Sequence, residues 1–439
     1  MAKKCLLLIL DGLGDRAHPE LKGLTPLQAA STPNLDRIAA RGSAGIYHPG
    51  TPGRAFPSEK AHFSLFGYSQ AEFPGRGLLE ALGHELSPGP QEVCLLAHLA
   101  GVSVQRGCFF LEQENPPEPQ QEELQQILDS LPHPDHPEMG IKFHPTRGSS
   151  GILILSGPVS PFFTDTNPMQ DRVFLPEPAP WEGLPSGERE WAGETASALK
   201  SYLLRVHQSL QEHPVNRQRS SRGLAPLNAL ITQRPGKMVQ APPFPERFGL
   251  RGATIASGAV YRGLAFFLGL DYYKASDSGD PGADLAERTR SGLELLRDYD
   301  LVHVHTKAPD TAAHSKSPQR KREVITALDR ALESLPPELI LDRDLLLAVT
   351  ADHSTPSSGP LIHSGEPVPL ALLSRDTRRD QVQRFEEAGC AAGALGLLRQ
   401  RELMYTILDG LNRSKLTGTR DTPQDLPYWP SKRDPFRIA

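Results

Sequence analysis

The chain has 439 residues, of which 38% are hydrophobic, and a formal net charge of −5 at pH 7. This length exceeds that of most single domains and indicates two or three of them. Because no large basic excess exists, nucleic acid and anionic membrane surfaces are not expected as main partners. The four cysteines are scattered without a CxxC pair. They indicate neither a zinc knuckle nor a disulfide framework, and they favour a cytoplasmic protein.

The chain opens with an apolar run over residues 5–10. The run is too short for a signal-peptide core or a membrane span, and it predicts a strand buried on both faces. Asp11 follows directly, so a carboxylate stands at the carboxyl end of this strand. Further along, a loop rich in Pro and Gly leads into Ser58, the expected start of a helix. Backbone N–H groups at such a position favour an anion, although Ser58 taken alone would be an ordinary helix cap.

The pattern changes in the middle of the chain, where new strands and helices lie between Pro-rich joins. The expected strands are residues 107–111, 151–156 and 227–232, and the expected helices are residues 120–131 and 188–211. We interpret residues 85–245 as a smaller inserted α/β domain. Residues 1–84 and 246–439 are then expected to form one discontinuous domain.

Strands and helices alternate after residue 246. Alternation of this kind predicts a mostly parallel sheet with helices on both faces. In an open sheet of this type, ligands bind beyond the carboxyl ends of the strands. The chemistry of the site is therefore expected from the residues that directly follow each strand.

Five potential metal ligands follow two expected strands, at residues 300–305 and 345–349. They are Asp310, His314, Asp352, His353 and His363. Asp310 and His314 are four residues apart and share one face of a helical turn. Carboxylates and neutral imidazoles together suit Zn²⁺, Mn²⁺ and related ions. Any one of the five alone would be an ordinary cap or surface histidine, but their common position after strand ends indicates a metal site.

Together with Asp11 and Ser58 the set contains three carboxylates, three imidazoles and one hydroxyl. Three carboxylates brought together without counter-charge would repel one another strongly. Two divalent cations would remove that cost, and seven ligands are too many for one tetrahedral zinc. A serine beside such a pair can lose its proton and attack phosphorus. The set therefore predicts phosphoryl transfer through a phosphoserine.

Several segments resemble the archaeal-type cofactor-independent phosphoglycerate mutases, which belong to the alkaline phosphatase superfamily. The resemblance spans nearly the whole chain, including the middle section. The segments include residues 11–15 (DGLGD), 24–30 (LTPLQAA), 32–36 (TPNLD), 307–310 (KAPD), 350–353 (TADH) and 363–369 (HSGEPVP).

The resemblance implies an alkaline-phosphatase-like fold, two metal sites and a reaction. One site would be Asp11, Ser58, Asp352 and His353, and the other Asp310, His314 and His363. Ser58 would be the phosphorylated nucleophile, with His62 as acid and base. The two ions would be Mn, Mg, Zn or Co. The reaction expected from the resemblance interconverts 3-phosphoglycerate and 2-phosphoglycerate, a small phosphorylated substrate, in the glycolytic direction or its reverse.

The middle section departs from the family pattern. The family carries an arginine-rich segment that helps to hold phosphoglycerate, and the corresponding residues 111–116 contain no arginine. A later basic segment is kept, in which Asn216, Arg217 and Arg219 are the expected substrate-binding residues. Guanidinium groups orient small bis-anionic substrates, so their partial loss leaves a second hypothesis open. This alternative is a metal-dependent phosphohydrolase acting on another small phosphomonoester or a phosphonate.

Overall fold

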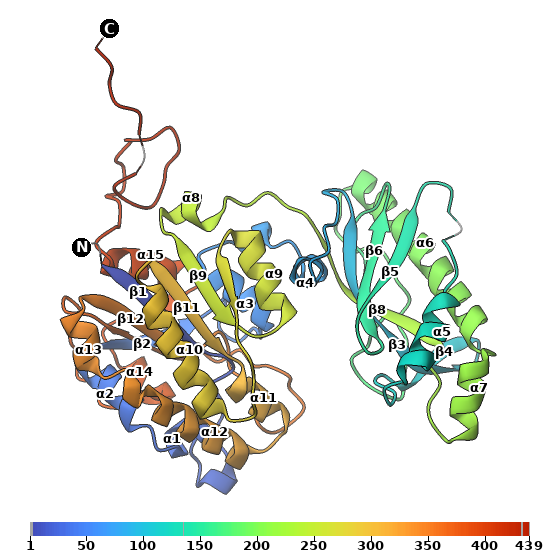
Figure 1. The fold of residues 1–439 in the computed structure, drawn as a ribbon, viewed down its shortest axis with the longest axis horizontal. Coiled ribbons are helices and arrows are strands. Elements are labelled where there is room, and N and C mark those ends of the chain that lie inside the picture. Colours follow the sequence, from blue (N-terminus) through green and yellow to red (C-terminus); the bar gives the residue numbers. More distant parts are fainter. Residues whose placement is uncertain (1–2, 135, 432, 439) are drawn as a thin grey trace. The chain divides into compact units, whose positions relative to one another are not determined.

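The computed structural model describes residues 3–134, 136–431 and 433–438, which form two compact units (Figure 1). Unit 1 comprises Met1–Phe73 and Ala241–Ala439, and unit 2 comprises Pro74–Gln240. The first join thus falls earlier than the expected boundary at residue 84. The reason is helix α4 (Arg76–Gly83), which packs on the sheet of unit 2.

Unit 1 is built on an eight-stranded sheet with the order β10-β9-β11-β1-β12-β13-β2-β14. Its strands are β1 (Lys4–Leu10), β2 (Ser43–His48), β9 (Gly252–Ala256), β10 (Asp271–Lys274), β11 (Leu301–Thr306), β12 (Leu345–Thr350), β13 (Val368–Leu373) and β14 (Gly396–Arg399). All neighbours pair in parallel except β12 with β13 and β13 with β2. The prediction of a mostly parallel α/β sheet is confirmed.

The three central strands of this sheet set the position of the site. Strand β1 is apolar and buried at every residue after Lys4, and it pairs in parallel with β11 on one side and β12 on the other. Leu10 lies opposite Thr306, and Ile9 lies opposite Thr350. The carboxyl ends of all three strands therefore meet at one edge of the sheet.

Several helices of unit 1, among them α2, α9, α10 and α15, pack against this sheet, and α10 and α12 lie side by side (Figure 1). The helices of unit 1 are α1 (Pro26–Ala29), α2 (Pro33–Arg41), α3 (Ser58–Leu65), α8 (Phe244–Phe248), α9 (Ala259–Leu268), α10 (Pro281–Leu295), α11 (Ala308–His314), α12 (Pro318–Ala331), α13 (Pro337–Asp342), α14 (Glu387–Ala391) and α15 (Glu402–Gly410). Proline at the first position and a capping side chain, such as Asp280 or Ser317, begin the longer ones. Among the described residues, no helix combines the length and apolar character needed to cross a bilayer.

Unit 2 is an α/β domain whose sheet has the order β5-β6-β3-β4-β7, with β8 paired to β3. Every pairing in it is antiparallel. Its strands are β3 (Val93–Gln105), β4 (Cys108–Gln113), β5 (Gly140–Arg147), β6 (Ser150–Ser156), β7 (Val173–Phe174) and β8 (Ala229–Lys237), and its further helices are α5 (Gln121–Asp129), α6 (Ser186–Leu210) and α7 (Pro214–Ser221). The long helix α6 and the sheet share one apolar core, to which Leu95, Leu153 and Leu199 belong.

A buried lysine fastens the loops that follow β1 and β12. The Nζ of Lys321, on α12, donates to the carbonyl oxygens of Gly14 and Thr355, both at 2.8 Å, and to Asp15 Oδ2 at 3.1 Å. Both Lys321 and Asp15 have no exposed side-chain surface. Burial lowers the pKa of Lys321, and Asp15 opposes that effect. The pair thus holds together two loops that carry candidate ligands.

We expect Lys321→Met to lower the free energy of unfolding by about 3–5 kcal/mol, because Asp15 would be left as a buried charge without its cation. Denaturant unfolding followed by circular dichroism measures the change. The double variant Asp15→Asn, Lys321→Met should recover part of the loss, since it removes both charges. A single variant as stable as the wild type would contradict this role.

Candidate active site

The predicted metal ligands gather at the carboxyl ends of β1, β11 and β12. Asp11 follows β1, Asp352 and His353 follow β12, and Asp310 lies in the first turn of α11, after β11. Potential ligand atoms within 4.8 Å of one another form two groups. The first group is Asp11, Asp352 and His353, and the second is Asp310, His353 and His363. His353 belongs to both.

Ser58 joins the first group. It is the first residue of α3, its side chain is buried, and its Oγ lies 3.0 Å from Nε2 of His353. The loop before it is fixed to the second group, because the carbonyl oxygen of Phe56 accepts a hydrogen bond of 2.8 Å from His363 Nδ1. The predicted nucleophile thus stands beside the ligands, and it is not the cap of α3, because Pro57 occupies the N-cap position.

His314 completes the second group. Its Nε2 lies 3.3 Å from Oδ1 of Asp310, and Nε2 of His363 lies 3.5 Å from the same oxygen. The spacing of four residues on α11 places Asp310 and His314 on one face, as predicted. The side chain of His314 is 38% exposed, whereas Asp310 is fully buried. All seven predicted metal-ligating residues are therefore brought together in unit 1.

The carboxylates are held in a way that fits metal binding. For Asp11, Oδ2 accepts from Tyr261 Oη at 2.6 Å and from His305 Nε2 at 3.0 Å. For Asp352, Oδ1 accepts from the backbone N–H groups of Gly12 and His353. Within the described part of the chain, Asp11 Oδ1 and Asp352 Oδ2 are buried without a hydrogen-bond partner. Buried oxygens of this kind are costly unless a cation binds them.

Asp310 follows the same arrangement. Its Oδ1 accepts from Thr355 Oγ1 at 2.8 Å, while its buried Oδ2 forms an ion pair of 3.2 Å with Nζ of Lys307. Each of the three carboxylates thus has one oxygen fixed by hydrogen bonds, and its second oxygen is buried at the site. This is the arrangement by which neighbouring groups orient metal ligands.

The ligand histidines are also oriented by hydrogen bonds to neighbouring groups. His353 Nδ1 donates to Thr355 Oγ1 at 3.1 Å, and His363 Nδ1 donates to the carbonyl oxygen of Phe56. The Nε2 atom of each ring is therefore left facing the carboxylates, and in its unprotonated form this atom binds a metal. Since carboxylates and neutral imidazoles converge with their free atoms inward, the residues present fit divalent cations.

The pKa shifts favour ionised carboxylates at Asp11 and Asp310 and a neutral imidazole at His353. Burial alone would raise the pKa of Asp11, but Lys307, His305 and His353 lower it below its ordinary range. Burial would likewise raise the pKa of Asp310, and its contacts with His314, His363 and Lys307 lower it instead. Burial lowers the pKa of His353. The charged carboxylates and the neutral imidazole are the states that metal ligands require.

Sequence reasoning missed the residues that support the ligands. Tyr261 on α9 and His305 on β11 bind Asp11, and Thr355 links Asp310 with His353. One signal was available for His305, because a histidine inside an otherwise apolar strand is uncommon. Tyr261 and Thr355 carried no such signal, since each is an ordinary residue in its own segment.

His62 is buried behind Ser58 and Asp352 and does not reach the surface of the site. Its ring is fully buried, Nδ1 donates to the carbonyl oxygen of Ser58 at 2.9 Å, and the same atom lies 3.3 Å from Asp352 Oδ2. Since no atom of the ring is exposed, this position does not favour the predicted exchange of protons with substrate. The geometry instead indicates that His62 positions Ser58 and Asp352.

The predicted substrate residues lie on and after α7 in unit 2. Arg219 is 1% exposed and donates to the carbonyl oxygens of Ala225 and Pro117. Asn216 is buried and bonds to the backbone of Leu210 and Leu227. Both side chains therefore hold the fold of unit 2, which corrects their expected role in substrate binding.

Arg217 differs from these two residues. Its side chain is 67% exposed and pairs with Glu212 at 3.0 Å. It is the one of the three predicted residues whose guanidinium group faces solvent.

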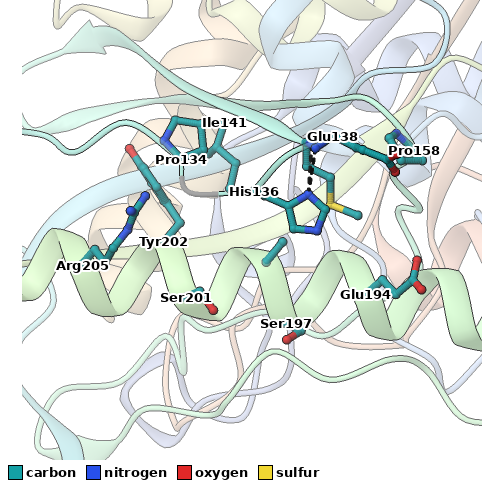
Figure 2. Close-up of a pocket in the computed structure, with 12 residues that line it drawn as sticks. Pro134, His136, Glu138, Ile141, Pro158, Glu194, Ser197, Ser201, Tyr202 and Arg205 are labelled. Atoms are coloured by element: carbon teal, nitrogen blue, oxygen red, sulfur yellow. Dashed lines mark hydrogen bonds between the residues drawn. The ribbon is translucent and has the colours of Figure 1, made fainter.

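A separate cavity of about 420 Å³ lies in unit 2, between α6 and the segment before β5 (Figure 2). Figure 2 shows Ser197, Ser201 and Arg205 on α6, and His136 and Glu138 on the segment across the cavity. None of the predicted catalytic, metal-ligating or substrate-binding residues is among those that line it.

Thr355 offers a test of the supporting residues. We expect Thr355→Val to weaken divalent metal binding by about 10- to 100-fold, because it removes hydrogen bonds that orient Asp310 and His353. Calorimetric titration of the metal-free protein with Mn²⁺ measures the affinity. Thr311→Val, on the exposed surface of α11, is the matched control. Equal affinities in both variants would contradict the role given to Thr355.

Comparison with known proteins agrees with this fold and site. The family model described as the metalloenzyme superfamily matches residues 3–410. The chain is therefore a member of that superfamily of metal-dependent α/β enzymes. More specifically, it belongs to the family of 2,3-bisphosphoglycerate-independent phosphoglycerate mutases, as the following relatives show.

The chain is 37% identical to 2,3-bisphosphoglycerate-independent phosphoglycerate mutase 2 of Methanocaldococcus jannaschii, over 98% of both chains. It is 33% identical to the mutase of Methanopyrus kandleri, over 95% of this chain and 99% of that one. Among solved structures, a protein from Pyrococcus horikoshii matches with a TM-score of 0.75 and 29% identity, over 95% of this chain and 100% of that one. The cofactor-independent phosphoglycerate mutase from Thermoplasma acidophilum matches with a TM-score of 0.63 and 28% identity, over 93% and 99% of the two chains.

Proposed function

We propose that this protein interconverts 3-phosphoglycerate and 2-phosphoglycerate through a phosphoserine at Ser58. The observation that carries the proposal is the position of Ser58, whose Oγ lies 3.0 Å from His353 Nε2 beside buried carboxylates with free oxygens. The names of the relatives identify the same reaction. The family resemblance and the local chemistry thus support one conclusion from independent directions.

We assign the metal ligands as two sets, with two divalent ions of Mn, Mg, Zn or Co. One set is Asp11, Ser58, Asp352 and His353, and the other is Asp310, His314 and His363. When bound, such ions would neutralise the carboxylates, favour the serine alkoxide and stabilise the charge that develops on the phosphoryl oxygens. The free oxygens of Asp11, Asp352 and Asp310 support this assignment.

The chain's own residues carry the transfer. Ser58 Oγ attacks the phosphorus of 3-phosphoglycerate, and the bond from phosphorus to the 3-oxygen breaks. The proton lost by Ser58 balances the proton gained by the 3-oxygen of glycerate. The 2-oxygen of the same glycerate then attacks phosphoserine, losing its proton as Ser58 regains one. His62 holds the backbone of Ser58 throughout, and the unexposed surroundings of the serine limit attack by water.

We further propose that Arg217, on α7, binds the substrate. Arg217 is the remaining candidate of the predicted arginines for the carboxylate or phosphate, because its guanidinium group is exposed. Its present partner, Glu212, is also exposed, so the pair is easily exchanged for a substrate anion.

The alternative, a phosphohydrolase, uses the same phosphoserine with water as acceptor. The altered middle section raised it, but the curated relatives are named as mutases and do not favour it. We also propose a cytoplasmic location, on the basis of the glycolytic reaction and the scattered free cysteines.

One assay separates the two reactions. The purified protein is incubated with 3-phosphoglycerate and Mn²⁺, Mg²⁺, Zn²⁺ or Co²⁺, and the metal is removed by chelation before phosphorus NMR. Formation of 2-phosphoglycerate without free phosphate supports the mutase. Free phosphate alone supports the hydrolase, and no reaction with any of the ions would overturn the proposed function.

A further inference from the structure

Lys307 lies close to carboxylates of both ligand sets. It stands between β11 and α11, at the N-cap of that helix. Its Nζ lies 3.2 Å from Asp310 Oδ2 and 3.9 Å from Asp11 Oδ2, so it reaches one carboxylate of each ligand set. Its side chain is 43% exposed, whereas both carboxylates are fully buried. The lysine therefore extends from solvent to the point where the two sets meet.

Other cations nearby are engaged by backbone groups. Lys316 Nζ donates to the carbonyl oxygens of Pro356 and Leu361. Lys321 is fully buried and fixed by two carbonyl oxygens and Asp15. The two partners of Lys307, in contrast, are residues that we assign to metal ions. Binding of the ions would occupy these carboxylates and leave the ammonium group available to another anion.

We propose that Lys307 contacts the phosphoryl group that is transferred to and from Ser58. This assignment rests on the proposed function and adds a substrate-binding residue to it. The lysine is the candidate for a positive charge at the transferred phosphoryl group, since residues 111–116 lack the arginines of the family pattern.

Charge balance supports the proposal. Two divalent ions against three carboxylates leave a single net positive charge, while a phosphoryl monoester carries roughly two negative charges at neutral pH. Lys307 supplies the second positive charge. Its flexible stem and three N–H donors allow it to follow the phosphoryl group as the group moves between oxygens.

The test compares Lys307→Met with Lys307→Arg, which keeps the charge. Lys274→Met, on the exposed part of β10, removes the same charge elsewhere and is the matched control. Each variant is loaded with Mn²⁺, its metal content is measured by mass spectrometry, and its affinity for inorganic phosphate is measured by calorimetry. Steady-state kinetics with 3-phosphoglycerate provides a second readout.

We expect Lys307→Met to keep the metal content of the wild type and to bind phosphate at least about 10-fold more weakly, as loss of a charge-assisted hydrogen bond predicts. Lys307→Arg should recover part of this affinity, and Lys274→Met should match the wild type. Unchanged phosphate affinity in Lys307→Met would overturn the proposal. Loss of metal in that variant would also overturn it, because Lys307 would then serve the ligands.

The result for Lys307 can be distinguished from the result of the mutase assay. If the wild type forms no 2-phosphoglycerate, the mutase proposal fails. Phosphate affinity still reports whether Lys307 contacts a phosphoryl group in the metal-loaded site.

Discussion

Ser58→Ala should reduce the rate of phosphoglycerate interconversion by at least about a thousandfold, because it removes the atom to which the phosphoryl group is transferred. The seven assigned ligands would lose one hydroxyl, while three carboxylates and three imidazoles remain. Metal content should therefore stay near that of the wild type. Coupled-enzyme kinetics and metal analysis of the same sample measure both quantities.

Ser64→Ala is the matched control for this change. Ser64 is a buried serine on the same helix, and its Oγ accepts a hydrogen bond from Gln70. Its replacement removes an equivalent hydroxyl without touching the ligand sets, so turnover should stay within a few-fold of the wild type. Undiminished turnover in Ser58→Ala would remove Ser58 from the mechanism.

His353→Ala should have the largest effect on metal binding, because Nε2 of His353 lies in both groups of converging ligand atoms. Loss of a supporting residue typically weakens binding 10- to 100-fold, so loss of a shared ligand should exceed about 100-fold. Turnover should fall with it. Calorimetric titration with Mn²⁺ and kinetics at saturating metal distinguish weakened binding from lost chemistry.

His84→Ala, at an exposed position after α4, is the control for loss of a histidine. It should leave metal affinity unchanged. If His353→Ala bound metal as tightly as this control, the assignment of His353 as a ligand would be contradicted, and the two groups would have to be divided differently.

The position of the site could be predicted because it follows from the order of strands and polar residues. The runs that became β1 and β12 are mainly apolar, the run that became β11 alternates apolar residues with histidines, and Asp11, Asp310 and Asp352 follow them closely. Parallel pairing then brings their ends together without further information. Ser58 was instead predicted from the loop that leads into its helix, and the division of the seven residues into two sets came from the family resemblance.

The supporting contacts could not be predicted in the same way. Thr355 links Asp310 to His353, and the carbonyl oxygen of Phe56 orients His363. Each contact depends on the path of a loop, and a carbonyl oxygen leaves no trace in the sequence. Residue type alone does not reveal such partners.

The same limit explains the corrected roles in unit 2. Arginine is expected at phosphate sites, and Arg219 has the right chemistry. In the structure it is buried against Ala225 and Pro117, where it fixes a loop. In unit 1, His62 was assigned from the family resemblance as acid and base, whereas α3 turns its ring inward against Asp352. The roles of Arg219 and His62 depend on whether their side chains are buried, and that burial results from tertiary packing.

The most direct test of the central claim is to locate the phosphoryl group during turnover. The metal-loaded protein is mixed with 3-phosphoglycerate labelled with radioactive phosphorus, quenched in acid within milliseconds, and mapped by mass spectrometry of its peptides. We predict that the label resides on Ser58 in the quenched sample. In a second sample, an excess of unlabelled 3-phosphoglycerate is added before the quench, and we predict that the label passes to 2-phosphoglycerate. Label on another residue, or label released solely as free phosphate, would contradict a phosphoserine mutase at this site.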